Sequence, residues 1–151
     1  MAELPESLRG EAPLPKLLYL WLEPRGVVRM STYQVARELG LTQTGVVSGL
    51  NRLRRLGLLV DEERGGGSIP PRFRVGSSES NGAIRLPSAL AGENPSVKLL
   101  WIWLKGQRAP QYSVRALERR LGLAHRTTYD GLRRLTELGR LERVGQRLRV
   151  K

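Results

Sequence analysis

The hydrophobic positions along the chain follow the same pattern twice. Lys16–Leu22 reads K-L-L-Y-L-W-L, and Lys98–Leu104 repeats it as K-L-L-W-I-W-L, 82 residues later. With this shift, 17 of the 44 positions in residues 16–59 are identical in residues 98–141, without a gap. So long an ungapped match indicates an internal duplication.

In the first copy the pattern predicts a short apolar helix over Lys16–Leu22, a brief strand over Val27–Met30 and a helix over Thr32–Leu39. Ser31 is a favourable N-cap for the second of these helices, and Gly40 ends it. Thr42 then caps a longer helix that runs to Gly57, with one apolar face formed by Val46, Leu50, Leu53 and Leu56. Strands are expected at Leu58–Val60 and Arg72–Val75, joined by a glycine turn.

The second copy has the same order of elements. Ser113 and Gly122 bound its middle helix, and the apolar face of the next helix consists of Thr128, Leu132, Leu135 and Leu138. Gly139 ends that helix, and strands are expected at 140–144 and 147–150. Each copy needs only about 60 residues, which is enough for one small core.

This order predicts a mostly α fold with small β-hairpin wings, of the α+β class. We expect a flexible tail over residues 1–14, a first domain over 15–75, a linker over 76–94 and a second domain over 95–151. A flexible linker of that length would have a root-mean-square reach of about 24 Å. Its apolar stretch at 83–90 is expected either to dock on a domain or to form a helical turn.

One segment carries a resemblance to a known family. Leu39–Val47, followed by Leu50, Leu53 and the sequence G-L-L-V at 57–60, resembles the winged helix-turn-helix domains of bacterial regulators, with the MarR- and ArsR-like families closest. The resemblance covers both copies and implies two tandem winged helix-turn-helix domains that bind double-stranded DNA. Those regulators usually dimerise through additional flanking helices, and the second copy, which stops at Val150-Lys151, leaves no room for such a helix at its C-terminal end. The tandem arrangement is therefore expected to replace a homodimer. It is also similar to that of plasmid replication initiators.

Charge supports a polyanionic partner. The net charge is +12 and the isoelectric point is about 11.3, with 26 basic against 14 acidic residues. All but four of the basic residues are arginines, either because arginine suits phosphate and guanine contacts or because of genome base composition. Residues 15–75 carry a net charge of +5 and residues 95–151 one of +10, so the second copy should supply more of the non-specific affinity.

Winged-helix docking, as the resemblance implies it, places the third helix of each copy in the major groove. The expected contacts in the first copy are Gln43, Thr44, Val47, Ser48 and Asn51, and those in the second are His125, Arg126, Tyr129, Asp130 and Arg133. We expect phosphate contacts from Arg52, Arg54, Arg55, Arg133 and Arg134, and wing contacts from Arg64, Arg72, Arg143 and Arg147. Because the two helices differ, the two heads should read different sequences.

The sequence gives little support to other chemistry. It has no cysteine, and a lone histidine is a poor metal site, so we expect no metal, no cofactor and no enzymatic activity. No phosphate-binding glycine loop is present, and no apolar run reaches the length of a membrane span. We expect a cytoplasmic, nucleoid-associated protein.

The favoured function is sequence-preferring binding of duplex DNA in transcriptional control, most simply as a repressor. A replication, partition or chromosome-architecture role, a protein–protein module, and RNA binding remain alternatives. We further expect Tyr19 and Trp101, at matching positions of the first helices, to form a contact between the two copies or between two chains.

Overall fold

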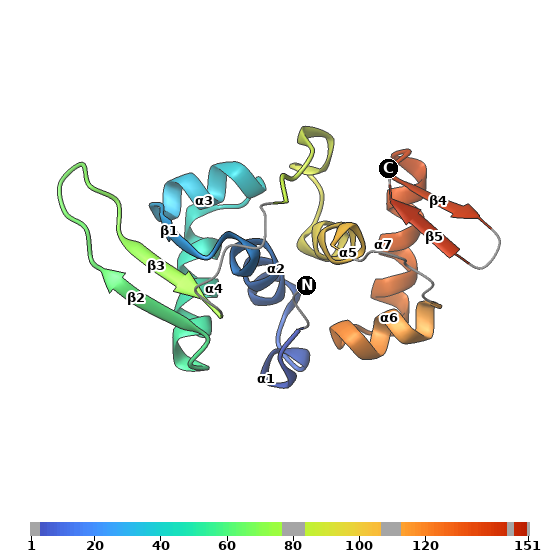
Figure 1. The fold of residues 1–151 in the computed structure, drawn as a ribbon. Coiled ribbons are helices and arrows are strands. Elements are labelled where there is room, and N and C mark those ends of the chain that lie inside the picture. The colour runs from blue at the N-terminus through green and yellow to red at the C-terminus, as the bar shows by residue number, and fades with distance from the viewer. Residues whose placement is uncertain (1–3, 77–83, 107–112, 145–146, 151) are drawn as a thin grey trace.

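The structure is a computed structural model that describes residues 4–76, 84–106, 113–144 and 147–150, except for the side chains of residues 143, 144, 147 and 149. Helices dominate it, and the strands form two small antiparallel sheets (Figure 1). The predicted class, mostly α with small β elements, is confirmed at this level. No helix in the described ranges is both long enough and apolar enough to cross a membrane.

The first repeat contains four α-helices, a 3₁₀ turn and one sheet in its described part. Its elements are α1 (Glu6–Arg9), α2 (Pro13–Leu22), η1 (Glu23–Arg25), β1 (Val27–Arg29), α3 (Thr32–Leu39), α4 (Gln43–Arg55), β2 (Leu59–Glu63) and β3 (Arg72–Val75). The sheet has the order β1-β3-β2, with Val28 opposite Phe73 and Leu59 opposite Val75. Phe73 and Val75 face the core from the central strand.

The second repeat follows the same order. Its described elements are η2 (Ser88–Leu90), α5 (Pro95–Lys105), α6 (Val114–Leu121), α7 (His125–Glu137), β4 (Leu141–Val144) and β5 (Arg147–Val150). The last two strands pair in register from Leu141–Val150 to Val144–Arg147. Residues 109–111, the counterparts of β1, lie outside the described part of the chain.

Helix ends follow the predicted signals. The Ser31 hydroxyl accepts a hydrogen bond from the Gln34 amide at 3.1 Å, and the Gln34 side chain accepts one from the Ser31 amide at 2.8 Å, which completes a capping box. Gly40 and Gly122 end α3 and α6 with φ of 63° and 62°, a conformation that favours glycine. Helices α2 and α5 begin earlier than predicted, because Pro13 and Pro95 occupy first-turn positions where no amide donor is needed.

The expectation of a flexible tail before residue 15 is corrected. Leu4 and Leu8 are buried, and Leu8 belongs to α1, which ends at Arg9 with Gly10 as its C-cap. The same 82-residue shift carries L-P-x-x-L-x-G-E at 4–11 onto residues 86–93, where Leu86 and Leu90 are also buried. We name these segments the first arm (residues 4–11) and the second arm (residues 86–93). The duplication therefore includes an apolar arm before each first helix.

The expectation of a flexible linker is corrected in the same way for residues 84–94. The second arm docks through Leu86 and Leu90, so the predicted docking of the apolar stretch is confirmed for these residues. Arg25 anchors the segment before the arm: its guanidinium donates to the Ile84 carbonyl at 3.0 Å and lies 3.8 Å from the ring centroid of Trp21. The remainder of the expected linker, residues 77–83, lies outside the described residues.

Helices α2 and α5 pack against each other at the centre and form the most extensive contact between the repeats (Figure 1). Both are buried along almost their whole length, which explains why they are apolar on all sides. Tyr19 and Trp101 retain only 8% and 3% of their exposure, and the Tyr19 hydroxyl lies beside Gly76 of its own repeat. The repeats therefore touch through their first helices, while the particular role of Tyr19 and Trp101 in that contact stays a prediction.

Candidate nucleic-acid interface

The predicted reading face of the first repeat is exposed and uncharged. It lies on α4 and consists of Gln43, Thr44, Val47, Ser48 and Asn51, all of them exposed. Val47 keeps 41% of its surface accessible although it is apolar, because the buried side of α4 is formed by other residues: Val46, Leu50 and Leu53. This face offers amide, hydroxyl and methyl groups to a partner and brings no charge.

Two local features fix α4 in place. The Thr42 hydroxyl accepts a hydrogen bond from the Gly45 amide at 3.1 Å and caps the helix, as predicted. Gly49 lies where any side chain would overlap Leu18 of α2, and Gly131 faces Leu100 of α5 in the same way. Glycine inside a helix costs roughly 1 kcal/mol relative to alanine. Its presence at both positions permits α4 and α7 to approach the central helices closely.

The predicted reading face of the second repeat carries charge. Arg126 is 93% exposed, and its guanidinium lies 3.8 Å from the Asp130 carboxylate, which is 62% exposed. His125 contacts Glu118 at 2.6 Å and stacks on Tyr129, with ring centroids 6.4 Å apart. The first turns of α7 therefore present an exposed cation, an anion and an exposed aromatic ring.

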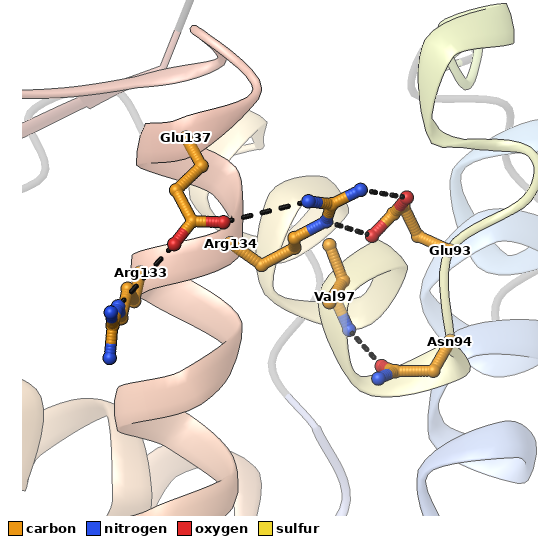
Figure 2. A network of polar contacts seen from close by, with 6 residues as sticks. All are labelled: Glu93, Asn94, Val97, Arg133, Arg134 and Glu137. Carbon is orange, nitrogen blue, oxygen red and sulfur yellow. Dashed lines mark hydrogen bonds and ion pairs between the residues drawn. The ribbon is translucent and has the colours of Figure 1, made fainter.

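Three of the predicted phosphate contacts are already engaged by carboxylates of the protein. Arg54 binds Asp61 of β2 at 2.8 and 2.9 Å, and the other two bind the arms. Arg52 binds Glu11 of the first arm through two hydrogen bonds of 2.5 and 2.9 Å. Arg134 binds Glu93 of the second arm in the same way, at 2.7 and 3.1 Å, and also reaches Glu137 (Figure 2). Arg52 and Arg134 hold the arms onto α4 and α7. The sequence did not predict this role because the recognised repeat began at Lys16 and left out both arms.

The geometry of these pairs changes the titration of the carboxylates. The hydrogen bonds from Arg52 are the main cause that lowers the pKa of Glu11, and those from Arg134 lower the pKa of Glu93. The guanidinium pKa values rise correspondingly. Each pair is therefore ionised throughout the neutral range.

The other predicted phosphate contacts are more accessible. Arg55 is exposed at the end of α4, and Arg133 is 71% exposed with a looser ion pair to Glu137 at 3.4 Å. Figure 2 shows Arg133 directed away from Arg134, on the other side of Glu137. Arg133 and Arg55 thus remain candidates for contact with a polyanion.

Among the predicted wing contacts, Arg64 is exposed in the turn between β2 and β3, and Arg72 lies 3.7 Å from Glu63. The side chains of Arg143 and Arg147 lie outside the described residues, and only their positions in β4 and β5 are given. The β2–β3 hairpin is largely neutralised by internal ion pairs, Arg54–Asp61, Arg74–Glu62 and Arg29–Glu63. Much of the positive charge of the arginines in the first repeat is therefore neutralised by carboxylates of the same repeat.

Several exposed side chains near these faces escaped the sequence reasoning. Tyr33 on α3 is 60% exposed and neighbours Thr32, whose hydroxyl accepts a hydrogen bond from Gln43 at 3.0 Å. Arg115 and Arg119 are exposed on α6 and make no ion pair within the described part of the chain. A wheel projection of the second helix of each copy would have shown them as solvent-facing.

Each exposed face borders a cleft at the start of the central helix of its own repeat. Leu14 and Pro15 of α2 line one cleft with Val47 and Arg55 of α4. Asn94 and Ser96 line the equivalent cleft with Asp130 of α7. Both clefts are open to solvent, so they extend the two helix faces and do not form an enclosed pocket.

Comparison with known protein families, with curated proteins and with solved structures finds no match for this chain.

Proposed function

We propose that this protein binds double-stranded DNA with sequence preference through two tandem winged helix-turn-helix heads, and acts as a transcriptional regulator, most simply a repressor. The observation that carries the proposal is the duplicated pair α3–α4 and α6–α7, in which the second helix of each pair presents an exposed polar face. A short turn between two such helices is typical of helix-turn-helix readers. The net charge of +12 supports a polyanionic partner.

We assign different roles to the two heads because their exposed faces differ in chemistry. Gln43 and Asn51 on α4 have the donor and acceptor pattern that matches adenine, and Val47 suits a thymine methyl group. Arg126 and Arg133 on α7 suit guanine or phosphate, with much of their surface accessible. The first head would contribute discrimination, and the second would contribute more of the affinity.

The test is fluorescence anisotropy with a duplex of about 30 base pairs, single-stranded DNA and a structured RNA at several salt concentrations. We expect the duplex to bind tightest. Arg126→Ala with Arg133→Ala should weaken it at least about tenfold and, if both contact phosphate, reduce the slope of log K against log salt by roughly 1.8.

The matched control is Arg85→Ala with Lys105→Ala, which removes the same charge. Lys105 ends α5, about 15 Å along the helix axis from the cleft at its start, and Arg85 lies beside Ile84, at the corresponding end of α2. Equal binding to all three nucleic acids, or an equal effect of both double variants, would contradict the proposal.

One observation favours a second candidate for the first head. Its α4 face carries no charge, which also suits a winged helix that binds protein. Gln43→Ala with Asn51→Ala separates the two: loss of sequence preference supports DNA reading, while unchanged duplex binding favours a protein partner for this head. A replication, partition or architectural role would use the same DNA surface.

A further inference from the structure

The two repeats contact each other through equivalent residues. Lys16 of α2 donates a hydrogen bond to the carbonyl of Gly122 at 3.1 Å, and Lys98 of α5 donates one to the carbonyl of Gly40 at 3.1 Å. Each lysine and each glycine is related to its counterpart by the same shift of 82 residues. Reciprocal contact of this kind defines a two-fold relation between the partners.

Both lysine side chains are almost completely covered by the protein, although the two hydrogen bonds are only partly buried. Lys16 and Lys98 are each only 1% exposed. Each ammonium binds the C-terminal end of a helix in the other repeat, where the helix dipole favours a cation. Burial lowers the pKa of both lysines, and Glu11 and Glu93 of the arms counteract that effect. A covered donor of this type is costly to leave without its acceptor, so the two hydrogen bonds oppose separation of the repeats.

The arms add a second reciprocal contact. Gly122 packs against the backbone of Arg9 in the first arm, and Gly40 packs against the backbone of Ala91 in the second. Each arm is also tied to its own repeat, through Glu11 or Glu93. The first arm therefore joins α4 of its own repeat to the turn before α7. The second arm joins α7 of its own repeat to the turn before α4. In Figure 1, α4 and α7 lie on opposite sides of the central pair α2 and α5.

We propose that the protein reads DNA as one rigid unit, on two dissimilar half-sites in inverted orientation at a single fixed separation. This inference rests on the proposed function. It differs from the behaviour of two heads on a flexible linker, which would accept many separations and either orientation.

The orientation follows from symmetry. Heads related by a two-fold axis meet the same DNA features only when the half-sites are related by a dyad of the duplex, as palindromic operators are for dimeric proteins. The dissimilarity follows from the reading faces. Ser48 and Asn51 of α4 correspond to Asp130 and Arg133 of α7, so equivalent positions carry different chemistry.

The first experiment is selection of the full-length protein on duplexes with 40 random base pairs. We expect two different half-motifs at one separation. Inserting five base pairs between them should weaken binding at least about tenfold, because it turns one half-site by about half a helical turn. Half-motifs at variable separations, tolerance of the insertion, or duplex binding without any enriched motif would overturn the inference while leaving duplex binding intact. Absence of duplex binding would overturn the proposed function itself.

The second experiment measures orientation on the selected duplex. Because the chain has no cysteine, a single one can be introduced to carry an iron–EDTA group that cleaves nearby DNA. Ser48→Cys and Asp130→Cys are equivalent, exposed positions. We expect their cleavage patterns to be related by rotation about one centre, with the strands exchanged. Patterns related by translation along the same strand would contradict the inference.

Arg55→Cys and Glu137→Cys form a second equivalent pair, at the ends of the reading helices, and their cleavage patterns should be related by the same rotation. A further variant tests the rigid connection: Lys16→Met with Lys98→Met keeps most of each buried side chain and removes both reciprocal hydrogen bonds. This double variant should lose less affinity for the duplex with the five-base-pair insertion than the unchanged protein does. If the folded double variant loses as much affinity as the unchanged protein, these hydrogen bonds do not set the separation of the half-sites.

Discussion

The contact between the repeats can be tested through four glycines that share one backbone conformation. Gly40, Gly57, Gly122 and Gly139 all have positive φ, between 62° and 75°. A Cβ at Gly40 or Gly122 would overlap backbone atoms of Ala91 or Arg9, whereas a Cβ at Gly57 or Gly139 would meet nothing within 4 Å. Replacement by alanine therefore separates backbone strain from the close approach of an arm.

The magnitudes follow from these two terms. Alanine in the left-handed region costs about 1–2 kcal/mol at any of the four positions. Gly40→Ala and Gly122→Ala add the overlap with an arm, and overpacking of this kind costs typically 1–3 kcal/mol because backbone cannot yield as a flexible side chain does. An additional 2 kcal/mol corresponds to a melting temperature lower by roughly 4–8 °C in a chain of this size.

Urea unfolding followed by tryptophan fluorescence measures the difference, since Trp21, Trp101 and Trp103 are all buried in the central helices. Gly57→Ala and Gly139→Ala are the matched controls. If Gly40→Ala and Gly122→Ala lower the free energy of unfolding by no more than the controls do, the close packing of the arms on the opposite repeat is wrong.

Two further predictions concern α7 and the arms. Thr42 caps α4 with its side chain, whereas its counterpart Ala124 has the same extended backbone and no capping side chain, so Ala124→Thr should stabilise the protein by about 1 kcal/mol in urea unfolding; a destabilised variant would contradict this. The pKa values of Glu11 and Glu93 are lowered in the folded state, so their contribution to stability is present above the unfolded value of about 4.3 and is lost as pH falls through the folded pKa. In the double variant Glu11→Gln with Glu93→Gln, the urea midpoint of unfolding should decrease less steeply with falling pH below about pH 4.5 than it does in the unchanged protein. An equally steep decrease in both proteins would refute the role of these pairs.

The sequence was sufficient for local structure because local structure depends on nearby residues. The caps at Ser31 and Thr42 and the stop at Gly40 use side chains or backbone within a few positions. The apolar face of α4 follows from helical periodicity alone. Exposure of the predicted reading residues followed from the same periodicity, since the positions between the buried ones must face outward.

The tertiary structure decided how the repeats meet and which arginines are engaged. Lys16 looks in sequence like a surface charge at the start of an apolar helix, and its burial depends on a carbonyl 106 residues away. Arg52 looked like a phosphate contact because the carboxylate that binds it belongs to an arm 41 residues earlier. Such pairings cannot be read from periodicity, because they depend on which surfaces pack together. By itself the sequence determined two similar units and their helices, and only the tertiary structure joined them into one unit with a two-fold relation, because contacts between distant residues set that geometry.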